Sequence, residues 1–571
     1  MLSLARQIVD RETNDKDANH LVRAVFLLLL GLCVASGAAI SDIYLHRGVE
    51  SGSEQPYVVQ PTGRDLATNI DLSLFPASKY DSIATVLQTN GFRFVRQHFT
   101  WSAIEPAKGT YDWTASDAIV ASLSAHGIRV VAVLDGSPAW SRDPAQTSYL
   151  DAPPVDPADF SSFVGEFVGH YASSIQFVQI WDLPNRADHW GGVPAAAASY
   201  VKLLTPAFNA SRAANSETKV ALSELDLYGA GTSAGDDLQF LKQAYDAGAK
   251  NVFDILSARI DGGGSSPYDR KVSGGRVNLS RAILFREVLI DHGDDAKAVW
   301  FTHYGWRIGA SQGVDATGQA DFMISGLERA RAEWPWSGLM FGWDLLPRSS
   351  PDDSTGYALL DLNGGATPAF KALSSFALTG NTTTAPTGFV PMDSSPVSYS
   401  GSWADQHLNR RTFKTTSETG AAATITFKGA GLISFLRRSP QAGPIHVTID
   451  GKPLPGRPVE DGAGLIELAY FQAQDIPVLL VSGLSDDVHT LTITLSGTGQ
   501  LTLGGLVVVR NPPLLWPVIV LLAVAGLLIM AAFRETIYVI AVRAGYLQRR
   551  RGIELTPQLP RMPDWRPSSR F

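Results

Sequence analysis

The chain has 571 residues, too many for one domain, since domains mostly run roughly 100–200 residues. Charged residues make up 18%, below the roughly 25% of typical soluble proteins, and the mean hydropathy of +0.03 indicates strongly apolar segments. The net charge of −8 gives no basic surface for nucleic acid, and the single cysteine, Cys33, excludes an internal disulfide framework and a cysteine-cluster metal site.

The first apolar segment covers residues 21–45 and follows a segment of mixed charge, residues 1–20. Its length is sufficient to cross a bilayer. The small residues from Ala35 to Ala39 also fit a cleavage site, so a signal peptide is the alternative. The four acids of the leading segment are unlike the short basic start of a signal peptide. We therefore predict an uncleaved transmembrane helix, followed by a linker at residues 46–67.

Eight short apolar segments alternate with helical patterns between residues 68 and 379. This alternation predicts an α/β fold, a (β/α)8 TIM barrel, rather than an open doubly wound sheet. No glycine-rich dinucleotide motif follows the first strand, and we predict neither a cofactor nor a metal site. The predicted strands are Asn69–Leu74, Phe92–Phe99, Arg129–Leu134, Ile175–Trp181, Lys219–Leu225, Val252–Ser257, Ala298–Thr302 and Gly338–Gly342.

Aromatic residues accumulate where these predicted strands end, which is the face that carries the active site in such barrels. Planar rings on a concave surface suit the apolar faces of sugar rings, so we predict carbohydrate binding there. The alternative is that the rings fill the core. The residues are Trp101, Trp140, Trp181, Tyr304, Trp306 and Trp343.

Composition changes after the barrel. Residues 380–396 are rich in Thr, Ser, Pro and Gly and predict a linker, and short alternating strands over 397–510 predict a jelly-roll-like all-β sandwich. Residues 514–533 carry no charge and predict a second transmembrane helix. The tail at 534–571 has eight arginines against three acids, which predicts a cytoplasmic location. Both termini would then be cytoplasmic at the plasma membrane, with residues 46–512 extracytoplasmic.

Five segments of the predicted barrel resemble clan A glycoside hydrolases, of the cellulase-like and xylosidase-like families: residues 91–120, 127–140, 178–192, 299–306 and 320–345. The resemblance implies an acid/base glutamate after strand four, in a Trp-Asn-Glu-Pro-Asn motif. It also implies a nucleophilic glutamate after strand seven, in a Thr-Glu-x-Gly-Trp motif. This chain has Leu183 and His303 at those two positions. Leucine cannot donate a proton, and histidine is a poor substitute for a carboxylate that must form a glycosyl ester.

Other polar residues near the strand ends offer substitutes. The fallback acids are Asp182, Glu224 and Asp226, although Asp182 should point away from the side occupied by Leu183, because neighbouring strand residues face opposite sides. Arg96 matches an arginine that supports the nucleophile in the family and here needs another acidic partner. Together with Asn185 and the aromatic residues, Arg96 completes the predicted sugar-binding set.

Three functions remain open from the sequence. The first is a membrane-anchored, catalytically impaired glycosidase-like protein that binds a cell-surface or secreted polysaccharide or oligosaccharide. The second is an active hydrolase or transglycosylase with an unorthodox acid/base pair. The third is a scaffold that binds a protein partner in an envelope or polysaccharide-export assembly.

Overall fold

A computed structural model describes residues 2–50, 65–146, 149–192, 196–227, 236–309, 313–347, 356–379, 383–408, 411–510 and 514–550. Residues 51–64 of the predicted first linker, residues 380–382 of the second and residues 551–571 at the end of the predicted tail lie outside these ranges. The chain divides into two compact units, one formed by Met1–Arg47 with Pro513–Phe571 and the other by Gly48–Pro512.

The larger unit begins with a closed barrel of eight parallel strands in chain order, which confirms the predicted fold. The inside of the barrel is filled by apolar side chains such as Phe94, Trp300 and Phe341, so the barrel is a packed core and not a pore. The strands are β1 (Leu66–Asn69), β2 (Phe92–Thr100), β3 (Arg129–Asp135), β4 (Phe177–Ile180), β5 (Lys219–Leu222), β6 (Ile255–Asp261), β7 (Ala298–Gly305) and β8 (Ser337–Gly342).

One predicted strand is wrong. The first strand was expected at Asn69–Leu74, but β1 ends at Asn69, and Leu72–Leu74 form a 3-10 turn. The carboxylate of Asp71 accepts a hydrogen bond from the backbone N–H of Ser73 at 3.1 Å. Such a local bond favours a turn over strand pairing.

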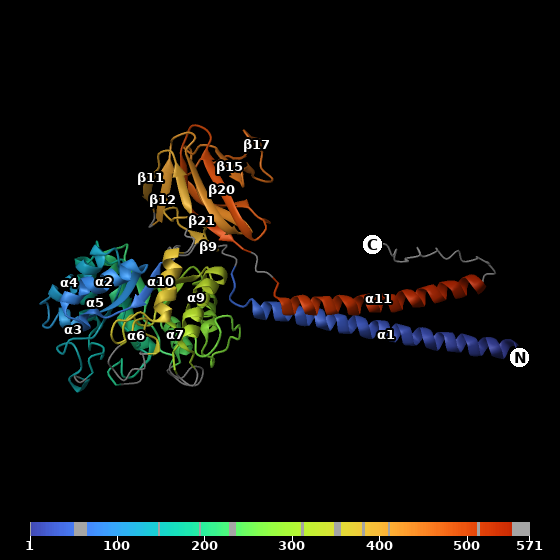
Figure 1. The fold of residues 1–571 in the computed structure, drawn as a ribbon, viewed down its shortest axis with the longest axis horizontal. Coiled ribbons are helices and arrows are strands. Elements are labelled where there is room, and N and C mark those ends of the chain that lie inside the picture. The colour runs from blue at the N-terminus through green and yellow to red at the C-terminus, as the bar shows by residue number, and fades with distance from the viewer. Residues whose placement is uncertain are drawn as a thin grey trace, which may run out of the picture. The chain divides into compact units, whose positions relative to one another are not determined.

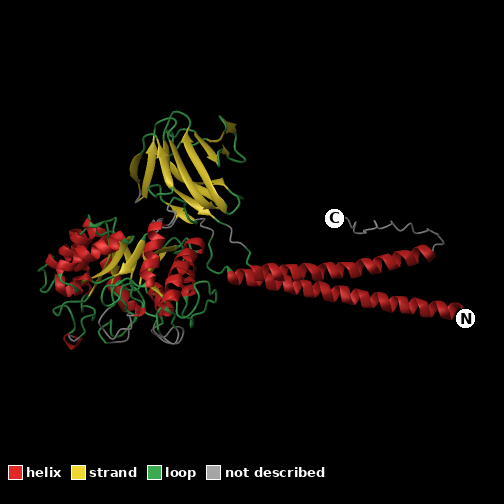
Figure 2. Ribbon diagram, in the orientation of Figure 1, coloured by secondary structure: helices red, strands yellow, loops and turns green. Residues whose placement is uncertain are grey.

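Helices surround the barrel, as Figures 1 and 2 show. Apolar residues on the outer face of the strands and the inner face of the helices form one continuous core. The helices are α2 (Tyr80–Thr89), α3 (Trp101–Ile104), α4 (Thr114–Ala125), α5 (Pro157–His170), α6 (Ala197–Ala214), α7 (Asp237–Asp246), α8 (Ala282–Asp291), α9 (Ala316–Glu333) and α10 (Pro368–Thr379).

Two antiparallel sheets follow the barrel and form the predicted β-sandwich (Figure 2). One sheet has the order β10-β13-β20-β15-β18-β17, with β16 on β15, and the other β11-β12-β21-β14-β19, with β9 on β21. Alternate residues face a shared apolar core. The strands are β9 (Gly388–Val390), β10 (Val397–Ser400), β11 (Ala404–Leu408), β12 (Arg411–Thr416), β13 (Ala422–Gly429), β14 (Gly431–Arg438), β15 (Ile445–Ile449), β16 (Lys452–Pro453), β17 (Val459–Glu460), β18 (Ala463–Ile466), β19 (Gln474–Val481), β20 (Asp487–Leu495) and β21 (Leu501–Val509).

The smaller unit is a pair of long helices, α1 (Leu2–Leu45) and α11 (Trp516–Arg550), which lie side by side (Figure 1). Both are long and apolar enough to cross a membrane. Buried positions recur every seven residues on each helix, as in a coiled coil. They are Asp17, Ala24, Gly31 and Ala38 on α1, and Val518, Ala525, Ala532 and Val539 on α11.

The small side chains in this repeat let the two backbones approach closely. A Cβ atom added at Gly31 would lie only 2.9 Å from Cγ1 of Ile529. Near one end of the pair, His20 Nδ1 lies 2.5 Å from Glu535 Oε2, and Arg543 Nε lies 3.2 Å from Asp17 Oδ2. The two helices are therefore matched by both packing and charge.

Candidate functional site

The candidate site is the mouth of the barrel, defined as the C-terminal ends of its eight strands and the residues that directly follow them. Arg96 on β2 is the central cation, and its side chain is 1% exposed. Its Nη2 donates to Asp182 Oδ1 at 2.5 Å, and the same nitrogen lies 3.9 Å from Glu224 Oε2. Its Nε donates to Gln179 Oε1 at 3.0 Å. Arg96 therefore joins the acids that follow β4 and β5.

Asp182 points into the mouth, contrary to the sequence expectation that it would point away. The cause is the backbone after β4, where Trp181 has φ 67° and Leu183 has φ 48°, both in the left-handed region. This conformation is unfavourable for residues other than glycine, by about 1–3 kcal/mol each. It is held by a hydrogen bond from the Leu183 N–H to the Glu224 carbonyl at 3.1 Å. A regular strand would not present Asp182 to Arg96.

Glu224 follows β5 and is fully buried. His303 Nδ1, on β7, lies 2.6 Å from Glu224 Oε2, and Arg259 Nε, on β6, lies 3.6 Å from Oε1. Burial opposes ionisation of Glu224, but His303, Arg96 and Arg259 together hold the pKa of its carboxyl well below the usual value. Burial also opposes ionisation of Asp182, and Arg96 nevertheless lowers its pKa. Both acids are therefore carboxylates at neutral pH.

His303 is neutral in this network. Burial lowers the pKa of His303 to about 4, although the neighbouring Glu224 opposes the shift. A neutral imidazole carries one N–H. With that proton on Nδ1, which faces the Glu224 carboxylate, His303 donates to Glu224 and its Nε2 carries no proton. The position at which the resemblance implies a nucleophile is thus occupied by a hydrogen-bond donor to an acid.

A second group of titratable residues lies at the ends of β2 and β3 and in the loop after β3. His98 Nδ1 lies 2.9 Å from Asp135 Oδ2, and His98 Nε2 lies 3.7 Å from Asp182 Oδ2. Burial opposes protonation of His98, but Asp135 and Asp182 outweigh it and raise the pKa of the imidazole. Burial, followed by the charge of Asp135, raises the pKa of Asp151 to about 6.

The side-chain amide of Asn185 is bonded to the backbone of Asp226, and this contact holds both residues at the mouth. The amide of Asn185 donates to the Asp226 carbonyl and accepts from the Asp226 N–H, both at 2.8 Å. The Asp226 carboxylate lies 3.1 Å from Arg186 Nη1 and 3.6 Å from Arg259 Nη1. Asp226 is therefore also ion-paired.

The predicted aromatic set separates into two groups. Trp101, Trp181, Tyr304 and Trp306 are at most 1% exposed. They pack against other rings, as Trp101 does against Trp140 and Phe163. These four rings therefore pack in the core, which is the alternative stated in the sequence analysis. Their burial leaves no ring face for a sugar.

Trp140 and Trp343 retain some exposure. Trp140 is half-buried, and Lys108 Nζ lies 5.4 Å from the centre of its ring. Trp343 stacks on Tyr357 with ring centres 4.1 Å apart, and the Arg259 guanidinium lies 4.6 Å from its ring. Sugar contact remains a prediction for these two rings.

Several residues of this network were missed from the sequence: Gln179, His98, Arg259 and Tyr357. Each except Tyr357 lies on a predicted strand or within a few residues of its end, and that position is the signal that would have found them. Tyr357 lies well after β8 and donates a hydrogen bond to Asp261 at 2.7 Å. No local pattern indicates that pairing.

A small cavity lies beside the ends of β1 and β8, with a volume of 180 Å³. Asp71, Phe75 and Asp344 are among its lining residues. Among the described residues no group of three or more His, Cys, Asp or Glu side chains is arranged to hold a metal ion.

Comparison with known proteins adds a family relationship for part of the barrel. Residues 74–143 match the family model of glycoside hydrolase family 42, described as beta-galactosidase. The match covers the barrel from the turn after β1 to the residues after β3, and it supports the predicted resemblance to glycoside hydrolases there. No curated protein matches the chain.

Solved structures of glycoside hydrolases align with this chain at low identity. A family 39 glycoside hydrolase from Bacteroides cellulosilyticus WH2 is 16% identical, with a TM-score of 0.46, covering 76% of this chain and 81% of that one. A glucosidase from Croceicoccus marinus is 13% identical, with a TM-score of 0.41, covering 79% and 98%. Xylanase 10B from Thermotoga maritima is 15% identical, with a TM-score of 0.39, covering 55% and 94%.

Proposed function

We propose that this chain is a membrane-anchored, glycoside-hydrolase-like protein whose barrel binds a polysaccharide or oligosaccharide outside the cell without hydrolysing it. One observation carries the proposal. His303 stands where the resemblance implies a nucleophile and is paired with a buried, ionised Glu224. Leu183, at the implied acid/base position, has no proton to give. Neither half of a retaining carboxylate pair is therefore present in the implied place.

Asp182 and Glu224 do not replace the lost pair. Glycoside hydrolysis needs one carboxyl group that stays protonated near neutral pH, and such a group has a raised pKa. Asp182 and Glu224 have lowered pKa values instead, Asp182 because of Arg96 and Glu224 because of His303, followed by Arg96 and Arg259. A hydrolase built on His303 with Asp182 or Glu224 would lack a proton donor, which argues against that form of the active-enzyme alternative.

Binding is supported by the polar character of the mouth. Asp135, Asp226 and Arg259 side chains are 12%, 15% and 17% exposed, so acceptors and donors face the opening together. Sugar hydroxyls can bond to both kinds of group, while the half-buried Trp140 offers an apolar surface to a ring. The ligand class comes from the resemblance to glycoside hydrolases.

The location is proposed from the two long apolar helices and the charge of the tail. Eight arginines and three acids after residue 533 favour a cytoplasmic C-terminus. Two spans then place the N-terminus in the cytoplasm and residues 46–512 outside. Protease digestion of intact and permeabilised cells tests this: a tag at residue 571 should be cleaved only after permeabilisation.

The binding experiment uses the full-length protein in detergent and a panel of β-glucans, xylans and secreted polysaccharides, measured by calorimetry. We expect saturable binding of at least one polymer. Absence of binding to every polymer, with an intact fold by circular dichroism, would contradict the proposal. In that case recovery of a stable protein partner by crosslinking would favour the scaffold alternative.

A further inference from the structure

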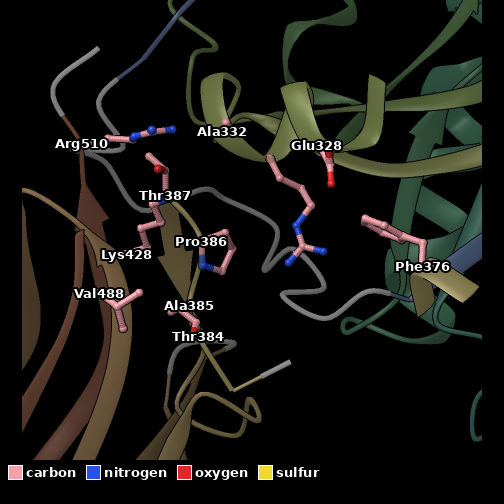
Figure 3. A pocket seen from close by; sticks show the side chains of 11 residues that line it. Glu328, Ala332, Phe376, Thr384, Ala385, Pro386, Thr387, Lys428, Val488 and Arg510 are labelled. Atoms are coloured by element: carbon pink, nitrogen blue, oxygen red, sulfur yellow. The ribbon is translucent and has the colours of Figure 1, made fainter. Parts of the chain in front are cut away.

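A cavity that the mouth does not explain has a volume of 360 Å³ and lies where the barrel meets the sandwich, within the unit Gly48–Pro512. Figure 3 shows Glu328, Ala332 and Phe376 on one side of it and Lys428, Val488 and Arg510 on the other. Glu328 and Ala332 belong to α9, Lys428 to β13, and Arg510 directly follows β21. Separate elements therefore build its walls.

Positive charge exceeds negative charge among the lining residues. Arg331, Lys428 and Arg510 are cationic, and Glu328 is the acid. The described contacts of Arg510 use only Nε, which donates to both oxygens of Asp486 at 2.7 and 2.9 Å, so its two Nη groups have no described partner. The Lys428 side chain is exposed, and no ion pair or hydrogen bond of its ammonium is seen among the described residues. Phe376 and Val488 add apolar wall.

The two connections to the long helices begin close to this cavity along the chain. Arg510 precedes the start of α11 at Trp516 by six residues, which can span at most about 20 Å. At the other connection, the Trp336 indole donates to the Gly48 carbonyl at 3.1 Å, and the Glu50 N–H donates to the carbonyl of Glu333, the last residue of α9. Arg331 and Glu328 lie within two turns of that same end of α9.

From this placement we propose that the cavity binds the phosphate headgroup of an anionic phospholipid. The unpartnered donors of Lys428 and Arg510 would contact the phosphate, and Phe376 and Val488 would face the less polar part of the lipid. Basic pockets near membrane spans attract anionic headgroups, at about 1 kcal/mol per cation. The inference rests on the membrane anchoring proposed above and is independent of sugar binding.

The test is native mass spectrometry of the full-length protein, titrated with phosphatidylglycerol or with phosphatidylcholine. Lys428→Gln/Arg510→Gln should weaken binding of one phosphatidylglycerol molecule about thirtyfold, because the loss of each cation weakens it about fivefold. The matched control is Lys452→Gln/Arg437→Gln. Lys452 is an exposed lysine, and Arg437 pairs with Asp475 as Arg510 pairs with Asp486. The control pair should bind like the unmodified protein.

Each other outcome overturns the assignment. Equal affinity in all three proteins would show that the lipid binds elsewhere, for example at the basic tail. Equal affinity for phosphatidylcholine would show that the cations do not select the headgroup. Displacement of phosphatidylglycerol by inorganic phosphate at similar concentration would identify a free anion as the occupant. Lys428→Gln alone, at an exposed position, repeats the test if the double variant unfolds at a lower temperature.

Discussion

The His303–Glu224 pair predicts a specific dependence of barrel stability on pH. Burial lowers the pKa of His303 from 6.5 to about 4, so between these values the unfolded chain binds a proton that the folded chain does not. The contribution of His303 to the free energy of unfolding is fully present above pH 6.5. It is lost as the pH falls from 6.5 to 4. A shift of this size corresponds to about 3 kcal/mol of unfolding free energy.

His303→Gln removes the titration and keeps a donor toward Glu224. Between pH 7 and pH 4, we expect the free energy of unfolding of the variant to fall by about 3 kcal/mol less than that of the unmodified protein. Asp151, with its pKa raised to about 6, acts in the opposite direction, because its folded form gains the proton first as the pH falls. That contribution is present in both proteins and cancels in the comparison.

The assay is urea unfolding at pH 7, 6, 5 and 4, followed by tryptophan fluorescence. The signal reports mainly on the barrel, because ten of the 13 tryptophans lie between residues 101 and 343. His126→Gln is the control, since His126 bonds to Thr85 and to the Ser122 carbonyl, away from the mouth. Parallel pH profiles for the unmodified protein and His303→Gln would refute the neutral, buried imidazole.

Three further predictions concern other parts of the molecule. Trp140→Ala should weaken sugar binding about three- to tenfold by calorimetry, whereas Trp403→Ala on the sandwich should leave it unchanged; equal effects would place the sugar elsewhere. Arg96→Met should lower the unfolding free energy by about 3–5 kcal/mol in urea, because two buried carboxylates lose their shared cation; a change below about 1 kcal/mol would refute that role. In a Cys33→Ser background, Ala24→Cys/Ala532→Cys should form a disulfide on oxidation, because both positions are buried between the two helices. Ala24→Cys/Phe533→Cys should not form one, because Phe533 is 67% exposed. The reverse pattern would contradict the helix pairing.

The barrel and sandwich could be predicted because their signals are local. Alternation of strand and helix patterns is visible over tens of residues, and apolar helices are visible by length. The first strand failed because residues 72–74 carry an apolar pattern while Asp71 caps a turn there. Side-chain hydrogen bonds of Asp71 and Gln97 hold that segment in its turn.

The arrangement of the mouth could be predicted only in part. The positions of Leu183 and His303 followed from motifs, but the partner of His303 lies 79 residues away on β5. The orientation of Asp182 depends on left-handed backbone at Trp181 and Leu183, which no residue type there favours. The burial of Trp101 and Trp306 depends on which side of the strands their rings face, and tryptophan is common both in cores and at binding sites.

The most direct test of the central claim is product analysis on a polysaccharide that the full-length protein binds. Protein and ligand are incubated near pH 7 for many hours, and new reducing ends and released oligosaccharides are measured by mass spectrometry, with Glu224→Gln as a parallel sample. The account predicts saturable binding and no product above a protein-free control. Release of oligosaccharides that disappears in Glu224→Gln would contradict it and identify an active hydrolase.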